Sequence, residues 1–280
     1  MDARVENYLR RGRFYVEGWL RTEAALTVIA LADRQRALGV NGGTAEIGVH
    51  HGKLFILLYL LSRSPERAVA VDLFDDQHLN IDQSGAGDLA RFRHNLERHA
   101  GSDRLVLKPG NSLALCGADL VRLADGPLRL ASVDGGHTAE IAAHDLATVE
   151  AALAEGGIVI VDDVFNEQWP GVGDGVRRWF ERRPNLVPFA IGANKTYFCR
   201  PSHRDVYRQA AVAAAGAATT TEFLGEAVAF LQFARPGFKD RLAASPLWRQ
   251  VRTTPVGLPL RWAWHTGRRL RRGLARREDF

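Results

Sequence analysis

The sequence lacks the features that mark disulfide-bonded, membrane-spanning and secreted proteins. Only two cysteines, Cys116 and Cys199, occur in 280 residues, and neither stands in a metal-binding or redox spacing. No apolar run reaches the ~18 residues of a membrane-spanning helix, and residues 1–13 are charged, without the apolar core of a secretory signal. We therefore expect a cytoplasmic protein with free, buried thiols.

Most of the chain also lacks net charge. The formal net charge is +5, and residues 261–280 account for all of it, with seven arginines against Glu278 and Asp279. A neutral body argues against nucleic acid as a partner. Trp262 and Trp264 stand among these arginines, a composition that suits an anionic membrane surface or an acidic partner. A solvated tail or a contact between subunits of a homo-oligomer is the simpler explanation.

An alternation of apolar and helical stretches organises the rest of the sequence. This pattern is typical of a mostly parallel sheet with helices on both faces. The last two strands are separated by residues 192–195 alone, too few for a crossover, so the final strand should be antiparallel. The predicted strands are 45–49, 68–73, 105–108, 128–133, 158–161, 187–191 and 196–199, and the predicted helices are 54–61, 88–99, 112–123, 138–154 and 173–182.

These elements predict a Rossmann-like α/β core with a seven-stranded sheet at residues 40–200. A helical flank, residues 1–39, precedes the core, and a helical and basic extension, residues 201–280, follows it. The helical pattern in this extension runs from 204 to 233. The long polar stretch 74–87 follows the second strand, so it is either a lid over the ligand or a surface loop.

The most informative stretch is residues 44–53, which predict a strand, a glycine turn and a helix. Its sequence has the form E-x-G-x-x-x-G, with Glu46, Gly48 and Gly52 at the fixed positions. Glycines let a ligand lie against bare backbone, and the following helix directs free N–H groups towards it. The spacing departs from the G-x-G-x-x-G of dinucleotide sites, and Leu54 stands where a Walker loop needs Ser or Thr. The glycine turn of the adenosylmethionine-dependent class I methyltransferases is the third alternative.

Polar residues stand at the carboxyl ends of the predicted strands, where open α/β sheets bind ligands. Asp72 ends the second strand, in the position from which an acid holds a ribose. Asn111 and Ser112 follow the third strand, Asp134 ends the fourth, and Asp162 and Asp163 end the fifth. We expect these residues to converge on one crevice.

Asp134, Asp162 and Asp163 suggest a metal site, because clustered carboxylates need a cation to stay ionised together. Ligands that are all oxygen favour Mg²⁺ over zinc. The alternative is that these acids cap the turns that follow their strands. His137 lies three residues after Asp134 and is either a general base or a solvated turn residue.

Residues 132–164 contain the motifs that most closely resemble those of a known family. The sequences V-D-G-G-H at 133–137 and G-G-I-V-I-V-D-D at 156–163 resemble the metal-dependent O-methyltransferases related to the macrocin sugar enzymes, and the wider bacterial group with cephalosporin-hydroxylase-type sequences. The resemblance covers roughly residues 40–200. It implies Mg²⁺ at Asp134, Asp162 and Asp163, and His137 as the proposed base. Asn111 departs from the family, which usually has Asp there.

The resemblance and the motifs together predict an S-adenosylmethionine-dependent O-methyltransferase, Mg²⁺-assisted, that acts on a hydroxyl of a sugar or glycosylated small molecule. A metal-free methyltransferase for small molecules is one alternative. A cofactor-binding module without turnover, docked to a partner or membrane through residues 261–280, is another. The residues expected to bind the cofactor are Glu46, Gly48, Val49, Gly52, Asp72, Asn111, Ser112 and Asp134.

Overall fold

The computed structural model describes residues 2–233. Two helices precede the sheet, α1 (Ala3–Arg10) and α2 (Thr22–Ala37), with a short 3₁₀ turn, η1 (Gly12–Phe14), between them. Residues 15–21 between η1 and α2 are not helical, so the predicted helical flank is interrupted. The predicted basic tail, 261–280, lies outside the described residues.

Strands and helices then alternate as the sequence predicts. Most boundaries fall within one or two residues of the predicted ones, and β4 has the predicted bounds. Short 3₁₀ turns η2 (Gln77–Leu79), η3 (Ser112–Ala114) and η4 (Pro201–His203) lie in the connections. The main elements are β1 (Gly43–Ile47), α3 (Phe55–Leu61), β2 (Ala68–Asp72), α4 (Leu89–His99), β3 (Leu105–Pro109), α5 (Gly117–Ala124), β4 (Leu128–Val133), α6 (Ala139–Ala152), β5 (Leu153–Asp162), α7 (Pro170–Phe180), β6 (Val187–Gly192) and β7 (Lys195–Cys199).

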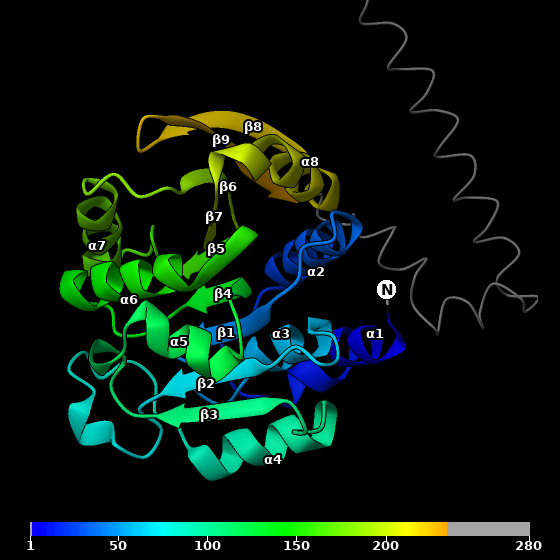
Figure 1. Cartoon of the computed structure of the whole chain (residues 1–280), viewed down its shortest axis with the longest axis vertical. Coiled ribbons are helices and arrows are strands. Elements are labelled where there is room, and N and C mark those ends of the chain that lie inside the picture. Colours follow the sequence, from blue (N-terminus) through cyan, green and yellow to red (C-terminus); the bar gives the residue numbers. More distant parts are fainter. Residues whose placement is uncertain (1, 234–280) are drawn as a thin grey trace, which may run out of the picture. The chain divides into compact units, whose positions relative to one another are not determined.

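The strands form one sheet in the order β3-β2-β1-β4-β5-β7-β6-β9-β8 (Figure 1). Strands β1 to β5 are parallel to one another, and β7 is antiparallel to both β5 and β6, as predicted. The chain order reverses between β1 and β4, which is where doubly wound sheets open a ligand crevice. The mixed α/β fold class is therefore confirmed.

The prediction of a helix from 204 to 233 is wrong beyond residue 215. Helix α8 (Arg204–Ala215) ends at Gly216, whose φ of +88° is a conformation that glycine adopts readily. The chain then forms a hairpin, β8 (Gly216–Phe223) and β9 (Glu226–Phe233), and β9 pairs with β6. Three consecutive threonines, 219–221, favour a strand there. The sheet therefore has nine strands within residues 2–233, two more than predicted.

Two apolar layers cover the two faces of the sheet. On one face, α1, α2, α3 and α8 pack around buried side chains such as Phe55 and Phe189. On the other face, α5, α6 and α7 pack around Leu146 and Trp179 (Figure 1). Cys199 is buried as expected, whereas Cys116 is exposed. No helix within residues 2–233 is both long enough and apolar enough to cross a membrane.

Candidate active site

A cavity of about 910 Å³ opens at the carboxyl ends of the parallel strands, at the point where the strand order reverses. Its volume lies in the upper range of small-molecule sites. The cavity is large enough for a nucleoside-sized cofactor together with an acceptor. The walls come from residues 19–21, the end of β1, the β2–α4 loop (residues 74–87), and the segments 110–112, 134–137, 162–169 and 193–195.

The glycine turn after β1 brings two chain segments into direct backbone contact. Gly48 has a φ of +85°, and a Cβ atom built on it would lie 1.7 Å from the carbonyl oxygen of Asp134. Any side chain is therefore excluded, and bare backbone lines the cavity here. Two other residues of the predicted motif lie elsewhere. Val49 is buried, and Gly52 faces the ring of Phe92, so neither lines the cavity.

Asp72, at the end of β2, supports this turn. Its Oδ2 accepts hydrogen bonds from the backbone N–H groups of Val49 (2.6 Å) and His50 (2.7 Å), and its Oδ1 accepts one from Phe74 (2.6 Å). Asp72 also lines the cavity. The acid at the predicted ribose position therefore holds the glycine turn while lying at the cavity wall.

Glu46 does not line the cavity, although the sequence predicts that it contacts the cofactor. The side chains of Glu46 and Thr44 lie on one face of the sheet, and those of Ala45 and Ile47 lie on the other. The side chain of Glu46 is 2% exposed. Its Oε2 has no hydrogen-bond partner within the described residues. Burial, together with the nearby carboxylate of Asp134, raises its pKa well above the ordinary value. Glu46 is therefore a buried residue beneath the site.

Asn111 and Ser112 both line the cavity, but their side chains are engaged locally. The Oδ1 of Asn111 accepts a hydrogen bond from the backbone N–H of Leu113 (3.0 Å). The amide oxygen of Asn111 thus already accepts one hydrogen bond. The hydroxyl of Ser112 donates to Oδ2 of Asp145 (3.1 Å), and burial raises the pKa of Asp145 to about 6.

The three predicted metal acids converge on the cavity, but they have different partners. Asp134, Asp163 and His137 each place one ligand atom so that all three atoms lie within 4.8 Å of one another. Burial and the neighbouring Asp162 raise the pKa of Asp134. The charge of protonated His137 and the hydrogen bonds from Asn166 and Asn194 outweigh burial and hold the pKa of Asp163 at about 2.

Asp162 lies outside this set of three and pairs with a lysine instead. Its Oδ2 is paired with the ammonium group of Lys195, which is buried. Its Oδ1 accepts from Nδ2 of Asn194 (3.0 Å) and from the backbone N–H of Asp163 (3.1 Å). Burial lowers the pKa of Lys195, but the carboxylates of Asp162 and Asp134 raise it by more. The net shift is upward, so the ammonium group stays charged.

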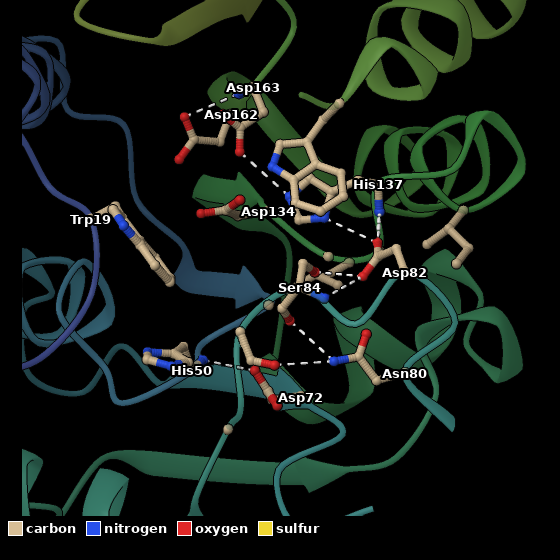
Figure 2. A pocket seen from close by; sticks show the side chains of 18 of the residues that line it. Trp19, His50, Asp72, Asn80, Asp82, Ser84, Asp134, His137, Asp162 and Asp163 are labelled. Atoms are coloured by element: carbon tan, nitrogen blue, oxygen red, sulfur yellow. Dashed lines mark hydrogen bonds and ion pairs between the residues drawn. The ribbon is translucent and has the colours of Figure 1, made fainter. Parts of the chain in front are cut away.

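His137 lies between two acids and against an aromatic ring (Figure 2). Its Nδ1 is 3.0 Å from Oδ2 of Asp82, and its Nε2 is 3.4 Å from Oδ2 of Asp163. The indole of Trp169 stacks on the imidazole, with ring centroids 4.3 Å apart. Burial lowers the pKa of His137, but the surrounding carboxylates, Asp163 first, raise it above its usual range.

Three residues of the site are missing from the sequence prediction. Lys195 directly follows the two-residue turn of the β6–β7 hairpin, where Ala193 and Asn194 both have positive φ. Asp82 belongs to the β2–α4 loop and meets His137 across 55 positions of sequence. Trp19 is 77% exposed, packs on His50 and lines the cavity mouth. Only the hairpin turn carried a signal, since its short length fixes Lys195 opposite Gly192 at the start of β7.

Comparisons with known proteins identify a domain and a shared fold. Residues 45–164 match the family model of a methyltransferase domain. No curated protein matched the chain. Among solved structures, the O-methyltransferase NovP is 19% identical, with 64% of this chain and 80% of NovP covered and a TM-score of 0.53.

Two further structures share the fold. Cofactor-bound Rv0187 from MTB is 19% identical, with 70% of this chain and 89% of its own covered and a TM-score of 0.50. The SAH-bound methyltransferase PaMTH1 of Podospora anserina is 15% identical, with 71% and 88% covered and a TM-score of 0.50. At these identities the structures show the fold, and the family match adds the activity class. Residues 45–164 therefore carry a methyltransferase domain, and the chain shares its fold with these methyltransferase structures.

Proposed function

We propose that this methyltransferase transfers a methyl group to a hydroxyl of a sugar or glycosylated small molecule, with assistance from Mg²⁺. The observation that carries the proposal is the meeting of Asp134, His137 and Asp163 in the same cavity as the glycine turn. A base and a candidate cation site beside the cofactor turn suit an acceptor that must lose a proton. The structural likeness to an O-methyltransferase, NovP, supports the choice of oxygen.

The cofactor-binding side of the cavity is the wall that includes Gly48, Asp72 and residues 110–112. S-adenosylmethionine supplies an already electrophilic methyl group, so the protein has to orient it and the acceptor rather than activate it. The backbone held by Asp72 gives that wall a fixed shape. Holding both reactants in line supplies much of the rate enhancement in such a transfer.

The residues that would hold Mg²⁺ are Asp134, Asp163 and His137, or the two acids alone when His137 acts as the base. Their carboxylate oxygens fit a hard divalent ion. When bound, such an ion lowers the pKa of the acceptor hydroxyl. The acid Asp162 would stay with Lys195 and act indirectly by holding the ammonium group beside Asp134, 3.9 Å away.

His137 would accept the proton of the acceptor through Nε2, the nitrogen on the side of Asp163. Its imidazole is mostly buried, and Trp169 fixes the plane of the ring. A positioned general base contributes ~10²–10⁴-fold in rate. Trp169 and Phe165, which also line the cavity, place aromatic surface where a sugar ring of the acceptor would lie.

Methyl transfer from labelled S-adenosylmethionine to a panel of glycosylated and free phenolic small molecules tests the proposal. We expect turnover with a glycosylated acceptor, its loss with EDTA, and its recovery with Mg²⁺ or Mn²⁺. His137→Ala should still bind the cofactor but lose ~10²–10⁴-fold in rate. Asp163→Asn should lose turnover mainly through loss of the ion, and excess Mg²⁺ should restore part of it. Turnover of free phenols alone would contradict the proposed acceptor class.

A metal-free methyltransferase is the second candidate, and the buried Lys195 favours it. This ammonium group already neutralises Asp162 and lies close to Asp134, so the acids do not depend entirely on a divalent ion. Full activity of EDTA-treated enzyme would establish this alternative. Cofactor binding without methyl loss across the whole panel would instead indicate a binding module without turnover.

A further inference from the structure

We propose that Asp82, in the β2–α4 loop, positions the imidazole of His137 and ties the placement of that loop to catalysis. This assignment rests on the proposed function, in which His137 is the base. Asp82 itself acts through His137 rather than on the reacting atoms. It is therefore a positioning residue, and neither the glycine motif nor the acid cluster contains it.

Asp82 and His137 make two contacts with each other. One oxygen of Asp82, Oδ2, accepts a hydrogen bond from the backbone N–H of His137 and lies 3.0 Å from its ring Nδ1. The side chains are 10% and 11% exposed respectively, so water screens the pair little. The other oxygen, Oδ1, accepts from both the backbone N–H (2.9 Å) and the hydroxyl of Ser84. The carboxylate is thereby held in one orientation (Figure 2).

This arrangement selects one form of the neutral imidazole. A carboxylate can only accept, and the contact of Nδ1 with Asp82 (3.0 Å) is shorter than that of Nε2 with Asp163 (3.4 Å), so the single proton of the neutral ring is held on Nδ1. The lone pair of the neutral ring must then be on Nε2, the nitrogen that faces Asp163 and the acceptor side. An acid that fixes the tautomer of a base in this way makes the base available in the right direction. Without Asp82, the proton can move to Nε2, and Nε2 then has no lone pair to take the proton of the acceptor hydroxyl.

The same contacts join the β2–α4 loop to the opposite wall of the cavity. Within residues 2–233, the hydrogen bonds that connect the tip of this loop (residues 80–84) to the α6 side are those of Asp82 with His137. Asn80 braces the tip internally, because its Nδ2 donates to the carbonyl groups of Ser84 and Gly85. Ile81, next to Asp82, is 71% exposed. The tip of the loop is therefore hydrogen-bonded to His137 through one acid.

The opposing explanation is that Asp82 only anchors the loop, with His137 as a convenient partner. Both explanations predict a looser loop when Asp82 is changed. Only positioning predicts a change in the tautomer of His137. The two are therefore separated by observing the imidazole nitrogens directly.

The experiment uses ¹⁵N-histidine-labelled enzyme bound to S-adenosylhomocysteine in the presence of EDTA. Long-range ¹H–¹⁵N spectra recorded over pH 7–10 report which nitrogen of each neutral ring carries the proton. The His137→Ala variant identifies the His137 signals among the nine histidines. We expect the Nδ1–H tautomer in the wild type and a mixture, or the Nε2–H tautomer, in Asp82→Asn. The matched control is Asp76→Asn, since Asp76 is exposed and belongs to the same loop.

Kinetics with the acceptor found in the panel complete the test. Asp82→Asn should lower kcat about 10- to 100-fold, the usual effect of losing a partner that orients a functional histidine. The KM for the cofactor should stay nearly unchanged, and Asp82→Asn should add no further loss to His137→Ala. An unchanged tautomer in Asp82→Asn, or equal losses with and without His137, would overturn the proposal. A fully active His137→Ala would instead refute the proposed function, whatever tautomer the spectra show.

Discussion

The buried ammonium group of Lys195 pairs with the carboxylate of Asp162 across the antiparallel strands β7 and β5. Both side chains are almost completely buried, at 3% and 6% exposure. The pair places a fixed positive charge at the carboxyl end of β5, beside Asp134. The acid cluster of this methyltransferase is therefore partly neutralised by the chain itself.

Replacing Lys195 with Met should destabilise the protein, because Asp162 would stay buried without its counter-charge. Breaking a buried ion pair by removing one partner costs about 3–5 kcal/mol. We expect this loss in the free energy of unfolding, measured by denaturant titration at pH 8 with EDTA. Mg²⁺ should recover more stability in Lys195→Met than in the wild type.

The matched control for this prediction is Lys108→Met. Lys108 lies on β3 and is only partly buried, so its loss should change the free energy of unfolding little. Equal stability of Lys195→Met and the wild type in EDTA would show that the ion pair does not neutralise the cluster.

Gly48→Ala should disrupt the site more than an ordinary glycine substitution. The new methyl group would overlap the carbonyl oxygen of Asp134, and backbone cannot move aside as a flexible side chain can. We expect a loss of about 3 kcal/mol or more in the free energy of unfolding, with no detectable S-adenosylhomocysteine binding by calorimetry. Gly39→Ala is the control, because Gly39 also has a positive φ (+70°) but has no other group within 4 Å of its Cβ position. Comparable losses in the two variants would refute steric overlap as the cause.

Asp72→Ala should weaken cofactor binding, since three backbone N–H groups lose their acceptor and the glycine turn is no longer held. Lost hydrogen bonds to a charged group correspond to about 1–3 kcal/mol. Calorimetry with S-adenosylhomocysteine should show that loss, and NAD should not bind the wild type. Asp76→Ala, from the adjacent loop, should bind normally. Unchanged affinity in Asp72→Ala would mean that other contacts hold the turn.

Much of the fold is predictable because its strands are short apolar runs buried on both faces, and such runs are visible in the sequence. Strands β1 to β7 and the antiparallel β7 follow from this pattern. The hairpin of β8 and β9 is not predicted, since residues 204–218 are rich in alanine and their composition favours a helix. Its strands form through pairing with each other and with β6, which composition does not reveal.

The candidate site is predictable only where its residues end strands. Asp134, Asp162 and Asp163 lie together because the fold places β4 and β5 side by side and parallel, so that their carboxyl ends meet. Their partners depend on how the connections fold. Asp82 reaches His137 from a polar loop without periodicity, and the pairing of Lys195 with Asp162 depends on the register of β5 and β7. The sequence therefore does not reveal that Asp162 pairs with a lysine while Asp134 and Asp163 form the candidate metal site.

Asp145 gives this methyltransferase a pH-dependent stability that is independent of the metal acids. It lies on α6, is fully buried, and accepts a hydrogen bond from Ser112. Burial raises its pKa to about 6, above the value of 3.8 for a free aspartate. Between these values the folded state binds more protons than the unfolded state, so the stability contributed by the protonated group falls as pH rises from about 4 to 6.

Asp145→Asn should remove this dependence, because an amide stays neutral at every pH. At pH 4 the free energy of unfolding of the variant should be equal to that of the wild type or slightly lower. It should be more stable by roughly 2–3 kcal/mol above pH 7, as expected for a pKa difference of about two units. Denaturant titrations of both proteins from pH 4 to 8 measure the difference directly. A difference that is constant over this range would show that Asp145 ionises in the folded protein at its ordinary pKa.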